Sequence, residues 1–164
     1  YRDLEGQFDK LVSIEMIEAV GHEFYGSYFR CLSKLLKPEG KAVIQAITIP
    51  DQRYQQARDS VDYIKRYIFP GGCLPSLKVI SENLAANTDM QMIDLLDITR
   101  DYAHTLEAWH HRFLEQLDKV RDMGFDDRFI RMWRFYLSYC EGGFRERIIG
   151  TFQITMVKPG YRPA

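Results

Sequence analysis

The pattern of apolar positions changes period twice within the first fifty residues. Residues 8–15 form a short run of apolar and β-branched residues, which predicts a strand buried on both faces or nearly so. Over residues 16–36 the apolar positions recur every three or four residues, which predicts a helix that Gly21 breaks near its start. A stop then precedes residues 41–49, which form a second apolar run and predict a second buried strand. The order strand, helix, strand predicts a parallel βαβ unit of a layered α/β domain.

The rest of the chain has a mostly helical pattern. Two prolines flank two glycines in residues 69–75, which predicts a fixed, non-helical loop. Ser76 can cap the helix that follows this loop, and Asp126 with Asp127 gives a later helix an acidic first turn. Alternation in residues 148–157 predicts a strand at a sheet edge. The expected helices cover residues 52–67, 76–86, 102–123 and 126–139, and a further strand covers residues 90–98.

Composition and charge fit one ordinary soluble domain over residues 1–164. Of these residues 46% are hydrophobic and 27% are charged, which is enough for a real core. A formal net charge of -1 disfavours a polyanionic partner such as nucleic acid. No run of about 18 apolar residues could span a bilayer, and residues 1–30 contain no secretion signal. Three cysteines without a CxxC pair argue against a disulfide framework or structural zinc and fit a reducing compartment.

The sequence contains no glycine-rich nucleotide loop. A doubly wound domain normally opens with a strand followed by a GxGxxG turn that lets the backbone approach a nucleotide. The first strand predicted here begins at Phe8 and has no such turn after it. We therefore expect this chain to be the C-terminal part of a catalytic domain, with any cofactor loop upstream of Tyr1.

Polar side chains at the ends of the two predicted parallel strands are the first candidates for chemistry, because ligands bind beyond the C-terminal ends of such strands. Glu15 and Glu18 follow the first strand. Glu18 is a candidate ligand or base, and the alternative is an acid that stabilises a helix N-terminus. Gln45 lies inside an otherwise apolar strand, where an amide without partners would cost about 1–3 kcal/mol. It either holds a ligand or is a satisfied structural amide.

The histidines and cysteines do not form a recognisable metal or nucleophile pattern. His104, His110 and His111 share one predicted helix, but their spacing is wrong for a close pair of ligands, so no metal is expected. Cys140 has no histidine nearby in the sequence to act as its base and is interpreted as a small buried thiol. Aromatic residues at helical spacing are interpreted first as core and second as the lining of a lipid channel.

Several motifs in a fixed order resemble one family. Two loop motifs, YIFPGGCLPS at residues 67–76 and YCEGGFR at residues 139–145, follow the βαβ unit. Together with Trp109 and the runs at residues 1–3, 8–14, 17–21, 36–40, 101–102 and 105–106, they resemble the cyclopropane-fatty-acyl-phospholipid synthase family. This family is a branch of the S-adenosylmethionine-dependent methyltransferases that includes the mycolic acid cyclopropane synthases. The resemblance implies an α/β fold, the C-terminal portion of a Rossmann-like class I methyltransferase sheet with added helices.

The resemblance also implies a reaction. The methyl group of S-adenosylmethionine is transferred to the cis double bond of an unsaturated phospholipid acyl chain, a proton is lost, and a cyclopropane ring closes. Because the intermediate is a carbocation, the site must exclude water and nucleophiles, and aromatic faces can stabilise the cation. In this family a bound bicarbonate acts as the base. The implied location is the cytoplasm, peripheral to a membrane, with phospholipid acyl chains as partners, no nucleic acid, and a homodimer left open.

Residues of the family's site can be carried over to this sequence. Glu18 matches the glutamate that holds the bicarbonate, Tyr102 matches the tyrosine, and Ile47 matches the position that contributes its backbone. Gln45 stands where the better-known members have a histidine, and an amide can still donate a hydrogen bond to an anion. Cys140 matches a family cysteine near the active site, although this chemistry needs no thiolate. Tyr1 and Arg2 match the segment beside the adenine. The residues that match the lining of the acyl pocket are Phe69, Leu74 and Phe144.

Two alternatives to a cyclopropane-forming enzyme stay open. Gln45 in place of the histidine motivates methyl transfer without ring closure, which would give a methyl-branched or methylene lipid. The missing cofactor loop and the many aromatic residues motivate a lipid-binding or interaction module without catalysis.

Overall fold

A computed structural model describes residues 1–163, and this part of the chain divides into two compact units. The first unit joins Tyr1–Asp97 to the C-terminal residues from Thr151 onward, and the second unit is Ile98–Gly150. The sheet and its covering helices belong to the first unit, and the second unit is helical. That the two units make up one domain stays a prediction.

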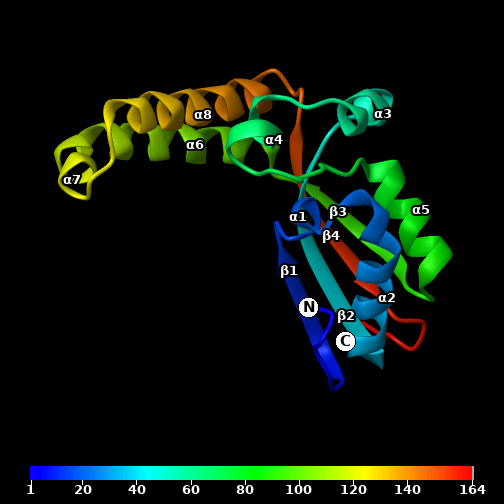
Figure 1. Ribbon diagram of the computed structural model, residues 1–164. Coiled ribbons are helices and arrows are strands. Elements are labelled where there is room, and N and C mark those ends of the chain that lie inside the picture. Colours follow the sequence, from blue (N-terminus) through cyan, green and yellow to red (C-terminus); the bar gives the residue numbers. More distant parts are fainter. Residues whose placement is uncertain (164) are drawn as a thin grey trace. The chain divides into compact units, whose positions relative to one another are not determined.

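The first unit is built on a four-stranded sheet with the order β1-β2-β4-β3 (Figure 1). β1 pairs with β2 in parallel, with Ile14 opposite Gln45, and β3 pairs with β4 antiparallel. The parallel pair confirms the predicted βαβ unit, and β3 and β4 confirm the two later strands. The strands are β1 (Phe8–Ile14), β2 (Leu36–Thr48), β3 (Gln91–Asp97) and β4 (Gly150–Val157).

Two predictions about the strands' surroundings are wrong. β1 lies at the edge of the described sheet, where Val12 and Ile14 are 67% and 63% exposed, although a strand buried on both faces was expected. β4 lies between β2 and β3, although an edge strand was expected. An apolar run specifies that a strand forms, but its neighbours are set by the strand order, which depends on contacts distant in the sequence.

The helix ends at Leu35, just before the predicted stop at residues 37–40, but the strand expected from residue 41 begins earlier, because β2 starts at Leu36 and runs through the stop. Pro38 and Gly40 are tolerated there because the pairing with β1 is irregular: Phe8 pairs with Leu36, whereas Lys10 already pairs with Lys41. Such a bulge accommodates residues that would break a regular ladder.

Six helices belong to the first unit, and several begin or end as the sequence predicts. Gly21 has φ +87°, a conformation that favours glycine, and it separates the first two helices. The Ser76 hydroxyl accepts a hydrogen bond from the Val79 N–H at 3.3 Å and caps α5 as expected. These helices are α1 (Ile17–Val20), the 3₁₀ helix η1 (His22–Phe24), α2 (Tyr25–Leu35), α3 (Asp51–Asp59), α4 (Tyr63–Tyr67) and α5 (Leu77–Asn87).

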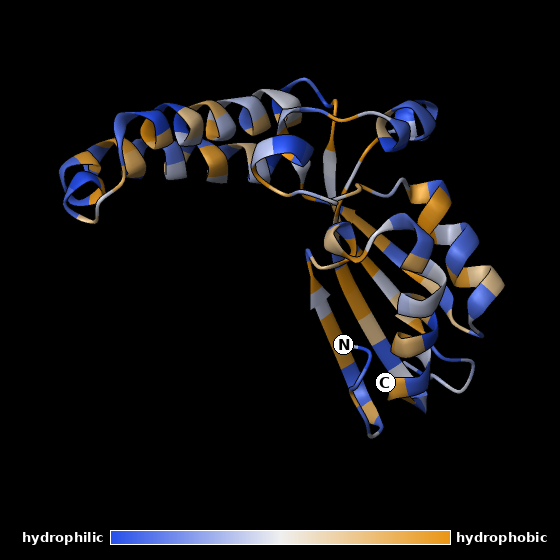
Figure 2. Ribbon diagram, viewed as in Figure 1, coloured by the Kyte–Doolittle hydropathy of each residue, from blue (hydrophilic) through white to orange (hydrophobic). Residues whose placement is uncertain are grey.

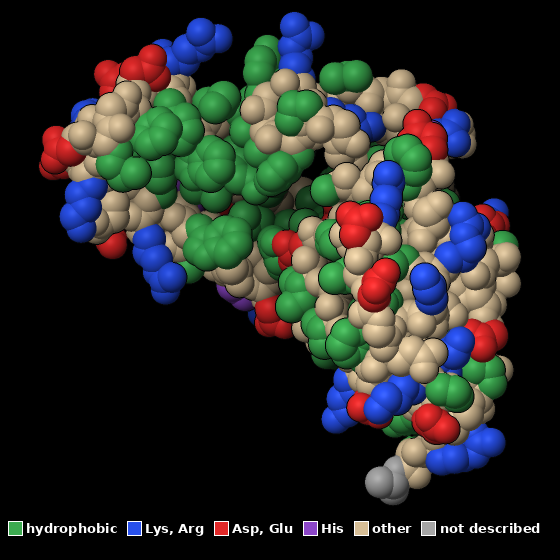
Figure 3. All heavy atoms as spheres, turned by 60° about the horizontal axis from the view of Figure 1, so that its bottom comes forward, with side chains coloured by type: hydrophobic (Ala, Val, Ile, Leu, Met, Phe, Trp, Pro, Cys, Tyr) green, Lys and Arg blue, Asp and Glu red, His purple; other side chains and the backbone are tan. Residues whose placement is uncertain are grey.

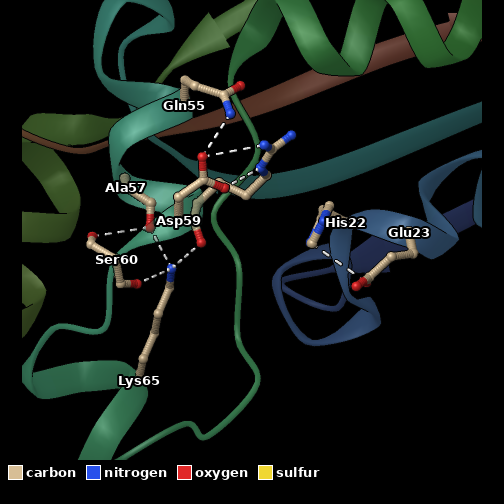
Figure 4. A network of polar contacts seen from close by, with 8 residues as sticks. His22, Glu23, Gln55, Ala57, Asp59, Ser60 and Lys65 are labelled. Carbon is tan, nitrogen blue, oxygen red and sulfur yellow. Dashed lines mark hydrogen bonds and ion pairs between the residues drawn. The ribbon is translucent and has the colours of Figure 1, made fainter.

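The helix predicted over residues 52–67 is split into α3 and α4 by side-chain capping (Figure 4). The Lys65 ammonium donates to the carbonyl oxygens of Ser60 at 2.9 Å, Arg58 at 3.2 Å and Ala57, at the end of α3. The Asp62 carboxylate accepts from the Lys65 N–H at 2.9 Å and starts α4. These bonds satisfy the free backbone groups at both helix ends, so the break is stabilised locally.

The core of the first unit lies between the sheet and the pair α2 and α5, which pack on each other. Hydrophobic residues concentrate along the strands and on one side of these helices (Figure 2). Ile44 and Ala46 alternate with half-buried residues along β2 and are fully buried. The largest fully buried side chains of the core are Tyr25, Tyr28, Phe29, Ile17, Leu36, Ile80, Ile154 and Met156.

The second unit consists of α6 (Thr99–Glu115), α7 (Leu117–Asp122) and α8 (Asp127–Arg145), with α6 packed on α8. Asp126 caps α8 as expected, through a 2.8 Å bond from the Phe129 N–H. The helix predicted over residues 102–123 is interrupted at Gln116. None of the helices within residues 1–163 is long and apolar enough to cross a membrane.

The helix predicted over residues 126–139 ends later than expected, because α8 continues through Gly142 and Gly143 to Arg145. Arg145 donates to Glu141 at 2.7 Å and pairs with Glu107 of α6 at 3.0 Å. These contacts within the last turn and across the hairpin support helical geometry where glycine alone would favour its end.

Candidate active site

The C-terminal ends of β1 and β2 bring together the acidic and amide side chains singled out in the sequence. The Glu15 N–H donates to the Gln45 carbonyl oxygen at 2.8 Å, which extends the parallel pairing beyond β1. Glu15 itself has φ +50°, an uncommon conformation for a residue other than glycine. The chain then enters α1, whose first turn carries Glu18.

Glu18 is the most perturbed carboxyl group of this region. Its Oε1 accepts a hydrogen bond of 2.5 Å from the Ile47 N–H, and its Oε2 is buried without a hydrogen-bond partner among the described residues. Burial raises the pKa of Glu18 from its ordinary value of 4.5 to about 7, since desolvation outweighs the hydrogen bonds that favour the charged form, and the nearby Glu15 charge acts in the same direction as burial. A carboxyl group with a pKa near neutrality is suited to accept or share a proton.

Gln45 is held by two neighbours, Glu15 and Gln153. Its Nε2 donates to Glu15 Oε1 at 2.8 Å, and its Oε1 accepts from Gln153 Nε2 at 3.0 Å. The amide therefore has structural partners, and the nitrogen that points to Glu15 keeps a second N–H. Gln153 was not selected from the sequence as a site residue. It has the same feature that singled out Gln45, because it is a polar amide within an apolar strand.

The loop predicted at residues 69–75 is non-helical, as expected, and the structure attaches it to α1 and α2. The Cys73 N–H donates to the Glu18 carbonyl oxygen at 2.8 Å, and the Cys73 carbonyl oxygen accepts from the Tyr25 hydroxyl at 2.6 Å. Burial is the main reason that the pKa of Tyr25 is raised, so this hydroxyl stays a donor. Of the two proposed acyl-pocket residues on this loop, Leu74 is half-buried and Phe69 is 56% exposed.

Tyr25→Phe tests whether this loop is held by the Tyr25 hydroxyl. We expect a loss of about 1–3 kcal/mol in the free energy of unfolding, because the buried Cys73 carbonyl loses its donor. Urea denaturation measures the change. Tyr54→Phe is the matched control, since no hydrogen bond of the Tyr54 hydroxyl is found among the described residues, and an equal loss there would contradict the assignment.

The residues matched to the adenine segment form a small aromatic cluster in the first unit. The Tyr1 ring packs edge-on against Tyr28, with ring centroids 5.8 Å apart. The Arg2 guanidinium lies 4.6 Å from the centroid of the Phe24 ring. Planar groups of this kind pack well on flat heterocycles.

The remaining candidates belong to the second unit. The Tyr102 ring packs on Phe144 with centroids 4.7 Å apart, and Phe144 is only 2% exposed. Cys140 lies half-buried on α8. The structure thus brings Glu18, Ile47 and Gln45 into one neighbourhood, and that Tyr102 and Cys140 share their site stays a prediction.

Comparison with solved structures identifies the class of fold. The structure is similar to the cyclopropane synthase MmaA2 from Mycobacterium tuberculosis, with a TM-score of 0.84 at 24% identity over 94% of this chain and 57% of that one. It is also similar to the mycolic acid cyclopropane synthase CmaA1 complexed with SAH and CTAB, with a TM-score of 0.82 at 26% identity, covering 95% of this chain and 57% of that one. The expected Rossmann-like methyltransferase sheet is confirmed.

The chain belongs to the mycolic acid cyclopropane synthetase family, whose pattern matches residues 1–154. It is 42% identical over 160 residues to tuberculostearic acid methyltransferase UfaA1 of Mycobacterium tuberculosis, covering 98% of this chain and 38% of that protein. It is 38% identical over 167 residues to cyclopropane-fatty-acyl-phospholipid synthase of Escherichia coli K12, covering 100% of this chain and 42% of that protein. The chain thus spans about two fifths of the length of these relatives. The family resemblance seen in the sequence is confirmed.

Proposed function

We propose that the full-length protein transfers the methyl group of S-adenosylmethionine to the cis double bond of an unsaturated phospholipid acyl chain and closes a cyclopropane ring. The observation that carries this proposal is Glu18, a carboxyl group with one buried oxygen left unpaired at the ends of two parallel strands. Membership of the family and similarity to a cyclopropane-fatty-acyl-phospholipid synthase support the substrate class.

Glu18 serves the step that closes the ring. Methyl transfer to an alkene carbon leaves a cation on the neighbouring carbon, and ring closure requires loss of a proton from the new methyl group. Since its environment raises the pKa of Glu18 to about 7, the ionised group holds a proton more strongly than an ordinary carboxylate does. Burial of the group also keeps water, which would trap the cation, away from the carboxylate.

The residues around Glu18 fit a small anion such as bicarbonate. The unpaired Glu18 Oε2 can accept a hydrogen bond from an acidic O–H group, and the second N–H of the Gln45 amide can donate one. The Ile47 N–H is already engaged by Glu18, so the anion would be held by these two side chains. When bound, bicarbonate would supply the base for the proton that is lost.

Tyr1 and Arg2 are the residues of this chain assigned to the cofactor. The Arg2 guanidinium over the Phe24 ring offers flat packing surfaces that suit an adenine ring, and the structure of the relative CmaA1 was determined with SAH. When bound, S-adenosylmethionine would supply the electrophilic methyl group.

A second candidate function is methyl transfer to a lipid without ring closure. Two observations favour it. Gln45 stands at the position of the family histidine and is bonded to Glu15 and Gln153, and the chain is 42% identical to a relative that is named as a methyltransferase. In that case a 1,2-hydride shift would move the cation onto the carbon that carries the new methyl group, and loss of a proton from this methyl group would leave a methylene double bond.

Mass spectrometry of lipids treated with the full-length protein and S-adenosylmethionine tests the proposal. We expect cofactor-dependent addition of one CH2 to unsaturated acyl chains. Mild hydrogenation before the measurement separates the two candidates, because a retained double bond takes up hydrogen whereas a cyclopropane does not. Hydrogen uptake by the product would favour the second candidate over ring closure. Absence of any product, together with absence of S-adenosylmethionine binding in calorimetry, would leave a lipid-binding module.

A further inference from the structure

The Gln45 side chain lies within a chain of hydrogen bonds that runs from the end of β1 across β2 to β4. Its Nε2 donates to Glu15 Oε1 at 2.8 Å on one side, and its Oε1 accepts from Gln153 Nε2 at 3.0 Å on the other. All three side chains are half-buried and belong to the first unit. The Glu15 backbone N–H also donates to the Gln45 carbonyl oxygen at 2.8 Å, so Glu15 contacts Gln45 at two points.

Glu15 is the residue that gives this chain of hydrogen bonds its direction. A carboxylate only accepts hydrogen bonds, whereas an amide carries a donor group and an acceptor group at its two ends. Gln45 therefore turns its Nε2 toward Glu15, which leaves its Oε1 for the Gln153 amide. If the Gln45 amide were reversed, two oxygens would face each other at Glu15, and neither would have a donor at that contact.

The backbone of Glu15 also sets it apart. Glu15 lies at the turn from β1 into α1, and its φ of +50° is a conformation that glycine adopts more easily. A side chain kept at such a position is a reason to look for a function. The same turn leads to Glu18, and the Glu15 charge adds to burial, the main cause, in raising the pKa of Glu18. The Glu15 carboxylate thus interacts with both side chains assigned to the anion.

We propose that Glu15 is a positioning residue, which fixes the orientation of the Gln45 amide and so presents the second Gln45 N–H to the bound anion. Glu15 acts through Gln45 and is assigned no contact with anion or substrate. The inference rests on the proposed function, in which Gln45 and the unpaired Glu18 oxygen hold bicarbonate. A reversed Gln45 amide would place an oxygen where this N–H lies, and an oxygen repels an anion.

Exchange of the two outer side chains tests the inference. The double variant Glu15→Gln, Gln153→Glu keeps the net charge, but it moves the carboxylate to the β4 side and so reverses the Gln45 amide. Bicarbonate is titrated into the full-length protein in a calorimeter, without S-adenosylmethionine or lipid. The double variant should bind bicarbonate about tenfold more weakly than the unchanged protein, because a donor to the anion is lost. Equal affinity would overturn the inference.

Urea denaturation in buffer without bicarbonate tests the orientation independently of the anion. The single variant Glu15→Gln should unfold at a lower urea concentration than the unchanged protein, because a neutral amide replaces the charged acceptor of the Gln45 N–H. The double variant should regain most of this loss, because a carboxylate again accepts from Gln45. A double variant that is no more stable than Glu15→Gln would contradict the orienting role.

Glu15→Asp is a second test that keeps the charge in place. Aspartate tolerates a positive φ, but its shorter side chain withdraws the carboxylate from Gln45 Nε2. This variant should also bind bicarbonate more weakly, and an affinity equal to that of the unchanged protein would count against the inference. A residue that only stabilised the fold would lower the urea midpoint and leave the bicarbonate affinity of the folded protein as it was.

The matched control is Glu39→Gln, which removes one carboxylate from an exposed position on β2. Figure 3 shows Lys and Arg side chains interspersed with Asp and Glu on the visible surface, so the loss of one exposed charge changes the local field little. Its bicarbonate affinity should stay within about twofold of the unchanged protein. An unchanged protein that methylates lipid without binding bicarbonate would contradict the anion of the proposed function, and the urea measurement would still decide whether Glu15 orients Gln45.

Discussion

Glu18→Gln in the full-length protein should reduce product formation by at least 100-fold without unfolding the protein. The amide oxygen can still accept the Ile47 N–H, so the local backbone keeps its hydrogen bond. The negative charge and the proton affinity of the buried carboxylate are lost, and with them the ability to support proton removal. Mass spectrometry of the acyl chains gives the yield of the methylated product.

The same substitution should change how stability depends on pH. Because the pKa of Glu18 is about 7 in the folded protein and about 4.5 when exposed, the folded state binds the proton more tightly. Its contribution to stability is complete below pH 4.5 and is lost as the pH rises through 7, by at most about 3 kcal/mol. Glu18→Gln should therefore remove this slope and be the more stable protein at pH 8, as measured by denaturant unfolding at both ends of the range.

The matched control for Glu18 is Glu23→Gln, five residues further along the chain. The Glu23 side chain is 64% exposed, and its one ion pair within residues 1–163 is with His22 at 3.5 Å in η1 (Figure 4). This variant should keep both the activity and the pH slope. A Glu18→Gln protein that forms product at the normal rate would refute the catalytic role, whatever its stability.

Elements with a strong local signal could be predicted from the sequence. The βαβ unit follows from a change of hydrophobic period, and the caps at Ser76 and Asp126 follow from side chains that bond to their own helix. The surroundings of β1 and β4 could not be predicted, because they depend on which strands pair across the sheet. The break between α3 and α4 at residues 60–62 could not be predicted either, because it depends on hydrogen bonds from the Lys65 side chain to three carbonyl groups at the end of α3.

The candidate site shows the same division between local and distant contacts. Ligands bind beyond the C-terminal ends of parallel strands, and this generalisation singled out Glu18 from the sequence. The structure joins Glu18 to Ile47, near the end of the neighbouring strand, by a hydrogen bond. The partners of Gln45 could be suspected from its burial but not identified, since Gln153 is 108 residues away. Glu15 could be selected because it is an acidic residue at the end of a strand. Its left-handed backbone conformation, with φ +50°, could not be predicted, because a glutamate gives no indication of a positive φ.

Gln45→Leu should reduce product formation by about 100-fold and lower the free energy of unfolding by about 2 kcal/mol. Leucine fills a similar volume but removes the donor to Glu15 and the acceptor for Gln153. It also removes the N–H group that we assign to the bound anion. Product analysis and urea denaturation measure the two effects separately.

Gln45→His separates the role in catalysis from the role in folding. Histidine restores an N–H donor at this position, so activity should return to within about tenfold of the unchanged protein even if part of the stability stays lost. Gln55→Leu, which removes an exposed amide on α3, should change stability by less than about 0.5 kcal/mol. If Gln45→Leu kept normal activity while being destabilised, the amide would be purely structural, and the anion would have to be held by Glu18 without it.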